Sequence, residues 1–571
     1  MNKTDVAAAL HEIGMILELL GENPFKVKAH VNAARAIETL QEDIGEIAAS
    51  GKLTEIRGIG AHIAEKITTL LETGSLPELE ELRKKVPAGI FEMLKIPGLG
   101  PKKAKAIWDK LGVTTVRELE YACNENRLKY LAGFGPKSQE NILKGIATIT
   151  KFAGRRLLAE AMEAAEPLLK WVAESPEVIR SQQAGSLRRG LETVKDIDIV
   201  ASSKKPEKVM ERFIKAPGVA DVINHGPTKS SVRLASGFQV DLRVVSDAEY
   251  PFALHHFTGS REHNTILRGL AKTMGLKMNE YGLFHGGKLV PCDDEVEIFG
   301  KLGLSFITPE LREGLDEIDA AKGDPPTLVE ANDVTGIFHC HTTYSDGTAS
   351  VEEMAKAAMK LGYKYIGISD HSRSAYYAGG LSIEELKRQS DEIDAVNAKL
   401  KGIKVFKGVE SDILPDGDLD YPDKILETLD FLIASVHSGF NMDEKKMTER
   451  MTRAAKNPHT TMIGHPTGRL LLAREGYPVN MEKLLEACAG NDVIMELNAN
   501  PHRLDIDWRA MGIAKKAGVK ISINPDAHRV SGLEDVKYGV MAARKGRLGK
   551  EDVFNTATAT AMEKELQRRK K

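Results

Sequence analysis

The stretch "GIFHCHTTYSDGT", from Gly336 to Thr348, holds two histidines one residue apart, His339 and His341, followed by Asp346. Histidine is the most common metal-ligating side chain in proteins, and this spacing indicates metal ligation. Taken alone, the pair also fits a core strand with a polar end. The residues downstream decide between these interpretations.

From residue 335 onward, apolar strand-like runs such as "YIGIS", "FLIASVH" and "VIMELN" alternate with helical stretches. This βα repeat predicts a parallel barrel, in which the carboxyl ends of the strands carry the chemistry. One histidine at such a place is more often a packed core residue, but nine ligand-type residues at the same end of successive strands are hard to explain by packing. They are His339, His341, Asp346, His371, Glu410, His437, His465, Asp526 and His528.

The chemistry of these ligands narrows the choice of metal. Mixed imidazole and carboxylate ligation suits Mn²⁺, Zn²⁺ or Fe²⁺, and suits Mg²⁺ alone less well. Nine ligands suffice for roughly three ions at three to four protein ligands each, which leaves open positions for water and substrate.

A second candidate metal site precedes the barrel, in "AGSLRRGLETVKDIDIV" (184–200). On a strand of about 3.3 Å rise, Asp196 and Asp198 fall on one face, and such a pair can bridge two metal ions. Asp241 lies in another strand-like run, "FQVDLRVV", and buried carboxylates there would need a counter-ion. A polar strand with an exposed edge is the alternative for the "DID" triplet alone.

Three segments near the amino terminus share an apolar-x-Gly-x-Gly pattern followed by a helix start: 56–67, 96–107 and 131–142. Such turns expose backbone N–H groups at a helix N-terminus, which cradle phosphates and hold a nucleic-acid backbone without reading its sequence. One copy could be an ordinary helix–turn–helix connection, but three copies favour DNA binding. The candidate contact residues are Gly58, Gly60, Gly98, Gly100, Lys102, Gly133, Gly135 and Lys137.

The bulk composition sets outer limits. The 571 residues predict about three to five domains. The four cysteines show no C-x-x-C spacing, so neither a disulfide framework nor a cysteine zinc site is indicated. The first twenty residues look like an amphipathic helix rather than a signal peptide, and no apolar run approaches the roughly 18 residues that span a bilayer. We therefore expect a cytoplasmic protein without a membrane partner.

The motif "GSLRRG", ten residues before the paired aspartates, closely resembles the nucleotidyltransferase motif of family X DNA polymerases. The segments "FALHHFTGSREHNTILRGLA" (252–271) and "MNEYGLF" (278–284) resemble that family's nucleotide and template contacts. The resemblance implies in-line displacement with two Mg²⁺ ions on Asp196, Asp198 and Asp241. It also implies nucleotide contacts from Gly185, Ser186, Arg189, Phe257, Gly259, Asn264 and Arg268.

Two positions depart from the family pattern. His256 stands where the family has the tyrosine of a Tyr-Phe pair, which bears on discrimination against ribonucleotides. Gln239 replaces an arginine often found two residues before the third acid, so the proton path from the primer hydroxyl is expected to differ.

The glycine turns resemble helix–hairpin–helix motifs. The first, with "NPFKVKAHVNAARAIETL" (23–40), resembles the lyase domain of the same family, in which a lysine forms a Schiff base with an abasic sugar. The matching residue is Lys66, while His30 and His62 replace a tyrosine and a basic residue of the family. A surface lysine would look the same in sequence.

The barrel ligands resemble the PHP (polymerase and histidinol phosphatase) domain, whose members are phosphoesterases. Arg469 and Arg474, just after "GHPTG", are candidates to hold the substrate phosphate, with surface solubility as the alternative. The chain as a whole therefore resembles a bacterial or archaeal family X DNA polymerase with a C-terminal PHP domain.

That resemblance implies a multidomain fold with helical helix–hairpin–helix domains, an α+β nucleotidyltransferase palm and a C-terminal α/β barrel of the distorted (βα)7 type. The expected domains are a lyase-like domain (1–82), a second helix–hairpin–helix domain (83–150), the palm (151–245), a nascent-base-pair-binding subdomain (246–319), a linker (320–334) and the PHP domain (335–571).

The implied function is gap-filling DNA repair synthesis, with a Mn²⁺- or Zn²⁺-dependent 3′→5′ exonuclease that also processes abasic sites and 3′ ends. The expected partners are gapped or primed DNA and dNTPs. The protein itself is expected to be a monomer. Two alternatives remain: a PHP domain that is a small-molecule phosphatase, and a DNA-binding scaffold with vestigial metal sites.

Overall fold

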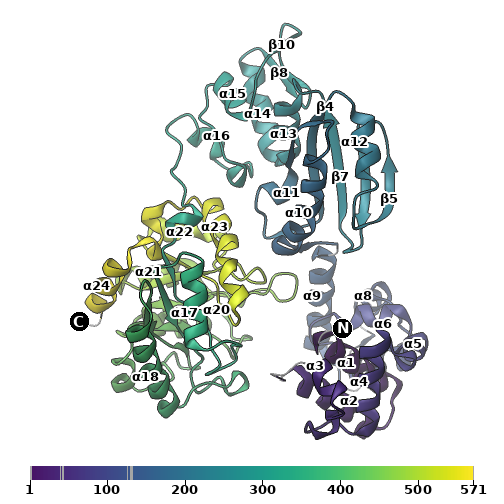
Figure 1. Cartoon of the computed structure of the whole chain (residues 1–571), viewed down its shortest axis with the longest axis vertical. Helices are drawn as coiled ribbons and strands as arrows, with labels where there is room; N and C mark the ends of the chain where they lie inside the picture. The colour runs from purple at the N-terminus through teal and green to yellow at the C-terminus, as the bar shows by residue number, and fades with distance from the viewer. Residues whose placement is uncertain are drawn as a thin grey trace. The chain divides into compact units, whose positions relative to one another are not determined.

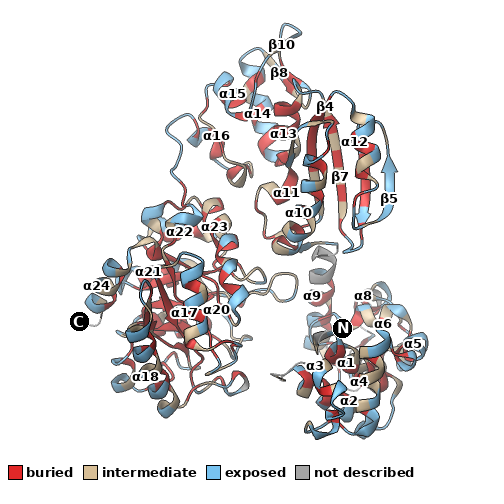
Figure 2. Ribbon diagram, in the orientation of Figure 1, coloured by how far each residue is buried: buried red, intermediate tan, exposed pale blue. Residues whose placement is uncertain are grey.

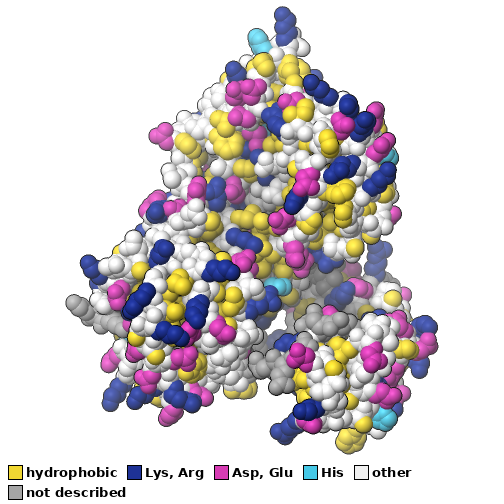
Figure 3. Space-filling model, viewed as in Figure 1, with side chains coloured by type: hydrophobic (Ala, Val, Ile, Leu, Met, Phe, Trp, Pro, Cys, Tyr) yellow, Lys and Arg dark blue, Asp and Glu magenta, His cyan; other side chains and the backbone are white. Residues whose placement is uncertain are grey.

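The computed structural model describes residues 3–38, 40, 44–124, 127–128, 131, 133–152 and 154–569. The chain divides into two compact units, Met1–Ala153 and Gly154–Lys571 (Figure 1). Among the described residues, no helix is both long and apolar enough to cross a membrane. Side chains of both charge signs are interspersed over the face seen in Figure 3, which matches the net charge of −3.

The first unit is helical. Its helices are amphipathic, as in α4, where Ile63, Ile67 and Leu70 recur at helical spacing and are buried. The helices are α1 (Lys3–Leu20), α2 (Pro24–Glu38), α3 (Ile44–Ala49), α4 (Ala61–Thr73), α5 (Pro77–Lys84), α6 (Ala88–Leu94), α7 (Pro101–Leu111), α8 (Val116–Asn124) and α9 (Pro136–Phe152).

The second unit begins with a five-stranded sheet in the order β2-β4-β7-β6-β5. Its strands are β2 (Val178–Gln183), β4 (Asp196–Ser203), β5 (Val219–His225), β6 (Lys229–Leu234) and β7 (Gln239–Val245). The central pair β4 and β7 is parallel, whereas the other pairs are antiparallel.

Alternation along β4 decides which face of the sheet is reactive. Ile197 and Ile199 are buried in the core that α10 (Leu158–Ala173) and α12 (Pro206–Phe213) share. Side chains alternate along a strand, so Asp196 and Asp198 lie on the other face. That face meets the short helix α11 (Gly185–Arg188) and α13 (Tyr250–Thr258).

A small subdomain follows, built on α13, α14 (Arg261–Thr273), the antiparallel sheet β10-β9-β8 and α15 (Glu295–Lys301). The strands of that sheet are β8 (Leu276–Asn279), β9 (Gly282–His285) and β10 (Lys288–Val290). Phe252 and Phe299 lie in its apolar core. We refer to residues 250–313 as the thumb.

The rest of the unit is a parallel barrel. Its strands are β11 (Gly336–Ile337), β12 (Tyr365–Ile368), β13 (Lys404–Lys407), β14 (Glu410–Asp412), β15 (Ile433–Ser435), β16 (Met462–Ile463), β17 (Ile494–Asn498) and β18 (Ile521–Asn524). They form the parallel sheets β11-β12-β13 and β14-β15-β16-β17-β18, joined by the bridges His371↔Glu410 and Cys340↔Ala527. Since β13 and β14 are one interrupted run, the fully described segment 336–524 has seven strand positions, the number that the family resemblance implies.

The interior of the barrel is divided by polarity. Phe338, Tyr365, Phe406 and Phe431 form an apolar plug, each ahead of the predicted ligand that follows it along the chain, and α24 (Ala559–Arg569) adds Met562 to the plug. Figure 2 shows the strands of the barrel in red, the colour of buried residues. The polar residues therefore lie at the opposite, carboxyl ends of the strands.

Helices cover the outside of the barrel: α17 (Val351–Lys360), α18 (Ile383–Lys399), α20 (Glu444–Ala455), α21 (Met481–Gly490), α22 (Trp508–Lys516) and α23 (Val536–Lys545). Two of them start with a capping box, Ser350 with Glu353 and Ser382 with Glu385, which satisfies backbone N–H groups at the first turn.

The expected linker, 320–334, is partly docked. Val329 is fully buried, and its backbone N–H donates to the carbonyl of Leu548 at 2.9 Å. The second half of this segment is therefore attached to the barrel rather than free.

Replacing the plug residue Phe338 with alanine should lower the free energy of unfolding of the barrel by about 3–5 kcal/mol, because a fully buried aromatic side chain leaves a cavity. Native-state hydrogen exchange of barrel peptides measures this change. Tyr376→Ala, at an aromatic residue with 86% of its surface exposed, is the control. An equal effect of both substitutions would contradict the assignment of the plug.

Candidate functional site

All nine predicted barrel ligands converge at the carboxyl ends of the strands. Their ligand atoms form four overlapping groups in which all atoms lie within 4.8 Å of one another. The groups are His341–Asp346–His371–His528, His339–Glu410–His465, His339–His341–Asp526 and His371–Glu410–His437.

Glu410, which is almost completely buried, is the centre of the cluster. Its Oε1 lies 2.9 Å from Nε2 of His465 and 3.2 Å from Nε2 of His437, and its Oε2 lies 2.8 Å from Nδ1 of His371. Although burial opposes ionisation, the surrounding imidazoles, His437 first among them, hold the pKa of Glu410 well below its usual range.

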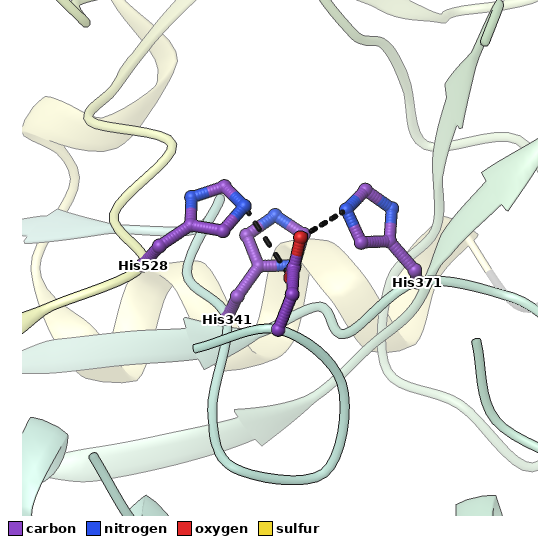
Figure 4. A group of neighbouring side chains, drawn as sticks. His341, His371 and His528 are labelled. Atoms are coloured by element: carbon purple, nitrogen blue, oxygen red, sulfur yellow. Dashed lines mark ion pairs between the residues drawn. The ribbon is translucent and has the colours of Figure 1, made fainter. Parts of the chain in front are cut away.

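Asp346 is a second centre, at the rim. Its carboxylate lies 3.4 Å from Nε2 of His528 and 3.6 Å from Nε2 of His371. Figure 4 shows His341, His371 and His528 pointing toward a common point.

The cluster fits metal ions by its unsatisfied atoms. The buried atoms Nε2 of His339, both ring nitrogens of His341, Nδ1 of His465 and Oε2 of Glu410 make no hydrogen bond. Buried polar atoms in folded proteins rarely lack a partner. Imidazole and carboxylate atoms that converge in this way are suited to bind divalent cations.

Two carboxylates behind the cluster were not identified from sequence. Glu496 on β17 is fully buried, with Oε1 at 2.7 Å from Nδ1 of His339, and Asp412 on β14 pairs with Nδ1 of His437. Outer carboxylates of this kind fix the ring orientation, so that Nε2 faces the metal. The available signals were a glutamate inside the apolar run "VIMELN" and an aspartate two residues after Glu410.

The arginines selected from sequence point elsewhere. Arg469 pairs with Asp507 at 2.5 Å, and Arg474 donates to the carbonyl of Gly468 at 2.8 Å. Arg503 is better placed, because its Nε lies 3.5 Å from Oδ2 of the ligand Asp526.

In the palm, β4 and β7 align Asp198 directly with Asp241. Burial, together with the charges of Asp196 and Asp241, raises the pKa of Asp198 to about 7. A β-carbon on Gly185 would lie 2.2 Å from Oδ2 of Asp198, so only glycine fits at the start of α11. The tight ligand groups found among the described residues do not include these three acids. Their shared negative charge nonetheless suits a divalent cation.

The departure at Gln239 is partly compensated. Its amide donates to Oδ1 of Asp241 at 2.9 Å, and Lys229 on the neighbouring strand β6 lies 3.3 Å from Oδ2 of the same carboxylate. Asp241 therefore has a positive neighbour, but this neighbour lies on β6. The arginine of the family pattern would lie on β7, the strand of Asp241 itself.

The two arginines of "GSLRRG" reach the thumb. Arg188 pairs with Glu295 at 2.6 Å, while Arg189 pairs with Glu313 at 3.1 Å and donates to the carbonyl of Thr258 at 2.5 Å. Ser186, in α11 beside them, is half-buried. An anionic ligand at this turn would have to share Arg189 with Glu313.

The predicted nucleotide contacts in the thumb cluster at the turn between α13 and α14. Phe257 packs against Arg243, and a β-carbon on Gly259 would lie 3.0 Å from Nη1 of Arg189. Asn264 is buried and donates to the carbonyl of His256 at 2.8 Å, and Arg268 donates to the carbonyl of Asn264 at 3.1 Å.

The helical unit contains the three expected hairpins. The first glycine of each turn is left-handed, with φ of +99° at Gly58, +80° at Gly98 and +85° at Gly133, a region that favours glycine. A β-carbon at Gly60, Gly100 or Gly135 would have no neighbour within 4 Å, so the turns leave room for a close backbone approach. Lys102 and Lys137 beside them are exposed.

Lys66 on α4 lies in a polar cluster. Its ammonium is 2.6 Å from Oε2 of Glu78 and 3.0 Å from Nε2 of His30. The ring of His30 also contacts the carbonyl of Lys26 through Nδ1 at 2.8 Å, and burial lowers its pKa. These contacts leave Nε2 of His30 as the acceptor facing Lys66.

Comparisons with known proteins match several parts of the chain. Helix-hairpin-helix domain families match residues 1–76 and 90–148, the DNA polymerase beta thumb family matches 253–313, and the PHP domain family matches 338–500. The chain is 39% identical, over the full length of both proteins, to the DNA polymerase/3′-5′ exonuclease PolX of Bacillus subtilis. Over 33% of its length it is also 30% identical to a "Probable phosphatase" of Caldanaerobacter subterraneus, covering 74% of that protein.

Removing the outer carboxylate Glu496 should weaken metal binding without removing a ligand. We expect Glu496→Gln to lower the metal affinity of the barrel by about 10- to 100-fold, because His339 loses the partner that orients it. Equilibrium dialysis against Mn²⁺ or Zn²⁺, with elemental analysis, measures this. Glu486→Gln, at an exposed glutamate of α21, is the matched control. Equal affinities for the two variants would show that Glu496 does not orient the site.

Proposed function

This chain belongs to the PolX family of DNA polymerase/3′-5′ exonucleases, and we propose that it fills short gaps in repair and trims 3′ ends. The observation that carries the exonuclease half is the convergence of all nine predicted ligands at one end of the barrel. The match to the Bacillus relative covers the full length of both chains. It therefore supports the presence of both polymerase and exonuclease activities in one chain.

For synthesis, Asp196, Asp198 and Asp241 would hold two Mg²⁺ ions, which supply activation of the primer 3′-hydroxyl and stabilisation of the departing pyrophosphate. The parallel register of β4 and β7 supports this role, since it sets Asp198 beside Asp241. Gly185 leaves room for the carboxylate of Asp198 at the start of α11. Ser186 and Arg189 would bind the triphosphate oxygens, and Phe257, Gly259 and Asn264 would line the nucleotide.

For hydrolysis, the barrel ligands would hold about three Mn²⁺ or Zn²⁺ ions, which supply Lewis-acid activation of water and of the phosphodiester. Glu496 and Asp412 would keep the imidazole rings oriented for this task. Arg503 would contact the phosphate of the 3′-terminal nucleotide, since it stands beside Asp526 and keeps 20% of its side chain exposed.

The substrates would be gapped or primed DNA and dNTPs. The hairpin turns at Gly58, Gly98 and Gly133 would hold the DNA backbone through their N–H groups, with Lys102 and Lys137 adding charge. Such contacts are independent of sequence, which suits a repair enzyme. We further propose that the protein acts as a monomer in the cytoplasm.

Lys66 would serve as the nucleophile of a deoxyribose-phosphate lyase. Its amine must be neutral to attack C1′ of an abasic sugar and form the Schiff base. Nε2 of His30, at 3.0 Å, would accept a hydrogen bond from the Lys66 amine, and Glu78 would orient the side chain.

The two metal sites should be separable by mutation. We expect Asp196→Ala to reduce primer extension on gapped DNA by about 100-fold or more while 3′ degradation persists, and His339→Ala to give the reverse pattern. Extension with dNTPs in Mg²⁺ and degradation without dNTPs in Mn²⁺ measure the two activities.

An Asp196→Ala protein that still extended primers would refute the palm assignment, and unchanged degradation by His339→Ala would refute the barrel assignment. The same preparations, tested on phosphorylated small molecules, separate an exonuclease from a phosphatase of the kind named among the relatives.

Lys66→Ala should abolish the covalent adduct that borohydride traps between the protein and abasic-site DNA, because the alanine side chain has no amine. Lys84→Ala is the matched control, since Lys84 is an exposed lysine at the end of the neighbouring helix α5. A trapped adduct of wild-type yield in Lys66→Ala would place the lyase nucleophile elsewhere.

A further inference from the structure

Helix α23 of the barrel carries Lys545, whose side chain is completely buried. Its ammonium pairs with Glu313 and donates to the carbonyls of Glu310, at 3.1 Å, and Arg189, at 3.3 Å. An ammonium has three donors, so these three acceptors satisfy it. All three belong to the polymerase half of the unit rather than to the barrel that carries the lysine.

Glu313 is shared. The carboxylate that pairs with Lys545 also accepts from Nε of Arg189 at 3.1 Å. A barrel lysine, a glutamate at the end of the thumb and a palm arginine thus form one largely buried network. In this network one carboxylate, that of Glu313, lies between two cations.

The residues just after Arg189 meet the barrel as well. A β-carbon on Gly190, where φ is +64°, would lie 3.2 Å from Cε of Met541 on α23. Two residues later, Oε1 of the buried Glu192 lies 3.4 Å from Nη1 of Arg509 and 3.8 Å from Nη2 of Arg469. The stretch 189–192 therefore meets the barrel domain through Arg189, Gly190 and Glu192.

Neighbouring charges on α23 do not reach this turn. Arg544 pairs with Glu310, near the end of the thumb, at 2.6 Å, and Arg547, just after the helix, pairs with Asp316, just beyond the thumb, at 2.5 Å. Lys545 differs because it contacts the backbone and the ion-pair partner of Arg189 at the same time. It is thus placed to fix both ends of that side chain.

We infer that Lys545 of the PHP domain is a positioning residue for DNA synthesis, because it holds the turn Gly185–Arg189 in the geometry that binds the dNTP triphosphate. The exonuclease domain is in this respect a structural part of the polymerase site. The inference rests on the proposed role of Arg189 in binding the nucleotide.

The test is Lys545→Met in the full chain, which keeps an unbranched side chain one atom shorter than lysine and removes its charge. We expect the KM for dNTP in gap filling to rise by about 5- to 50-fold with a smaller change in kcat, since a misplaced binding group weakens the nucleotide complex. Degradation of single-stranded DNA in Mn²⁺ should be unchanged. Lys515→Met is the control, because Lys515 on α22 pairs within the barrel with Asp552 at 2.6 Å.

A second readout does not depend on activity. Hydrogen exchange of peptides covering 185–192 should be faster in Lys545→Met than in Lys515→Met. If the wild-type protein does not extend primers at all, the proposed function fails, yet the exchange result still tests the contact. If Lys545→Met does not fold, Lys545→Gln takes its place, and a folded variant with unchanged dNTP KM and unchanged exchange overturns the inference.

Discussion

The barrel depends on one buried negative charge. The carboxylate of Glu410 lies where histidines follow β11, β12, β15 and β16, and a charge without partners there would be prohibitively unstable. Its imidazole neighbours stabilise it, and two of them pair with further carboxylates: His437 with Asp412 and His339 with Glu496. The apolar plug at the other end of the strands supplies the rigidity that holds these rings within ligand distance of one another.

The two candidate metal sites are built on different principles. The palm presents carboxylates only, on the face of a sheet, which suits a hard cation that arrives with a nucleotide. The barrel presents mostly imidazoles in a deep, preformed cluster, which suits borderline ions held for longer periods.

The sequence was informative where a periodic pattern carried the chemistry. The nine barrel ligands lie at or just after strand-like runs, and the glycine turns precede helix starts, so spacing indicated them; the paired acids needed the resemblance of "GSLRRG" to a known family as well. It failed where tertiary contacts decide. Glu496 is hidden in an apolar run, Arg469 and Arg474 looked like phosphate ligands but bond to protein groups, and Arg503 lies on a loop without a pattern. Nothing local distinguishes Lys545 from the basic residues around it, since the acceptors of its ammonium are more than two hundred positions away.

The way the barrel closes has a consequence for its biosynthesis. Its first strand pairs with its last through the bridge of Cys340 to Ala527, and Thr335 bonds to the carbonyl of Asn555 at 3.0 Å. Contacts of such high contact order form slowly and require both partners. While the ribosome is still making residues 340–520, the first strand of the barrel lacks the partner strand that closes the barrel. The apolar faces of the completed strands remain exposed during this time. The palm, complete much earlier, can fold first, and the last helices then join the two halves in a single late step.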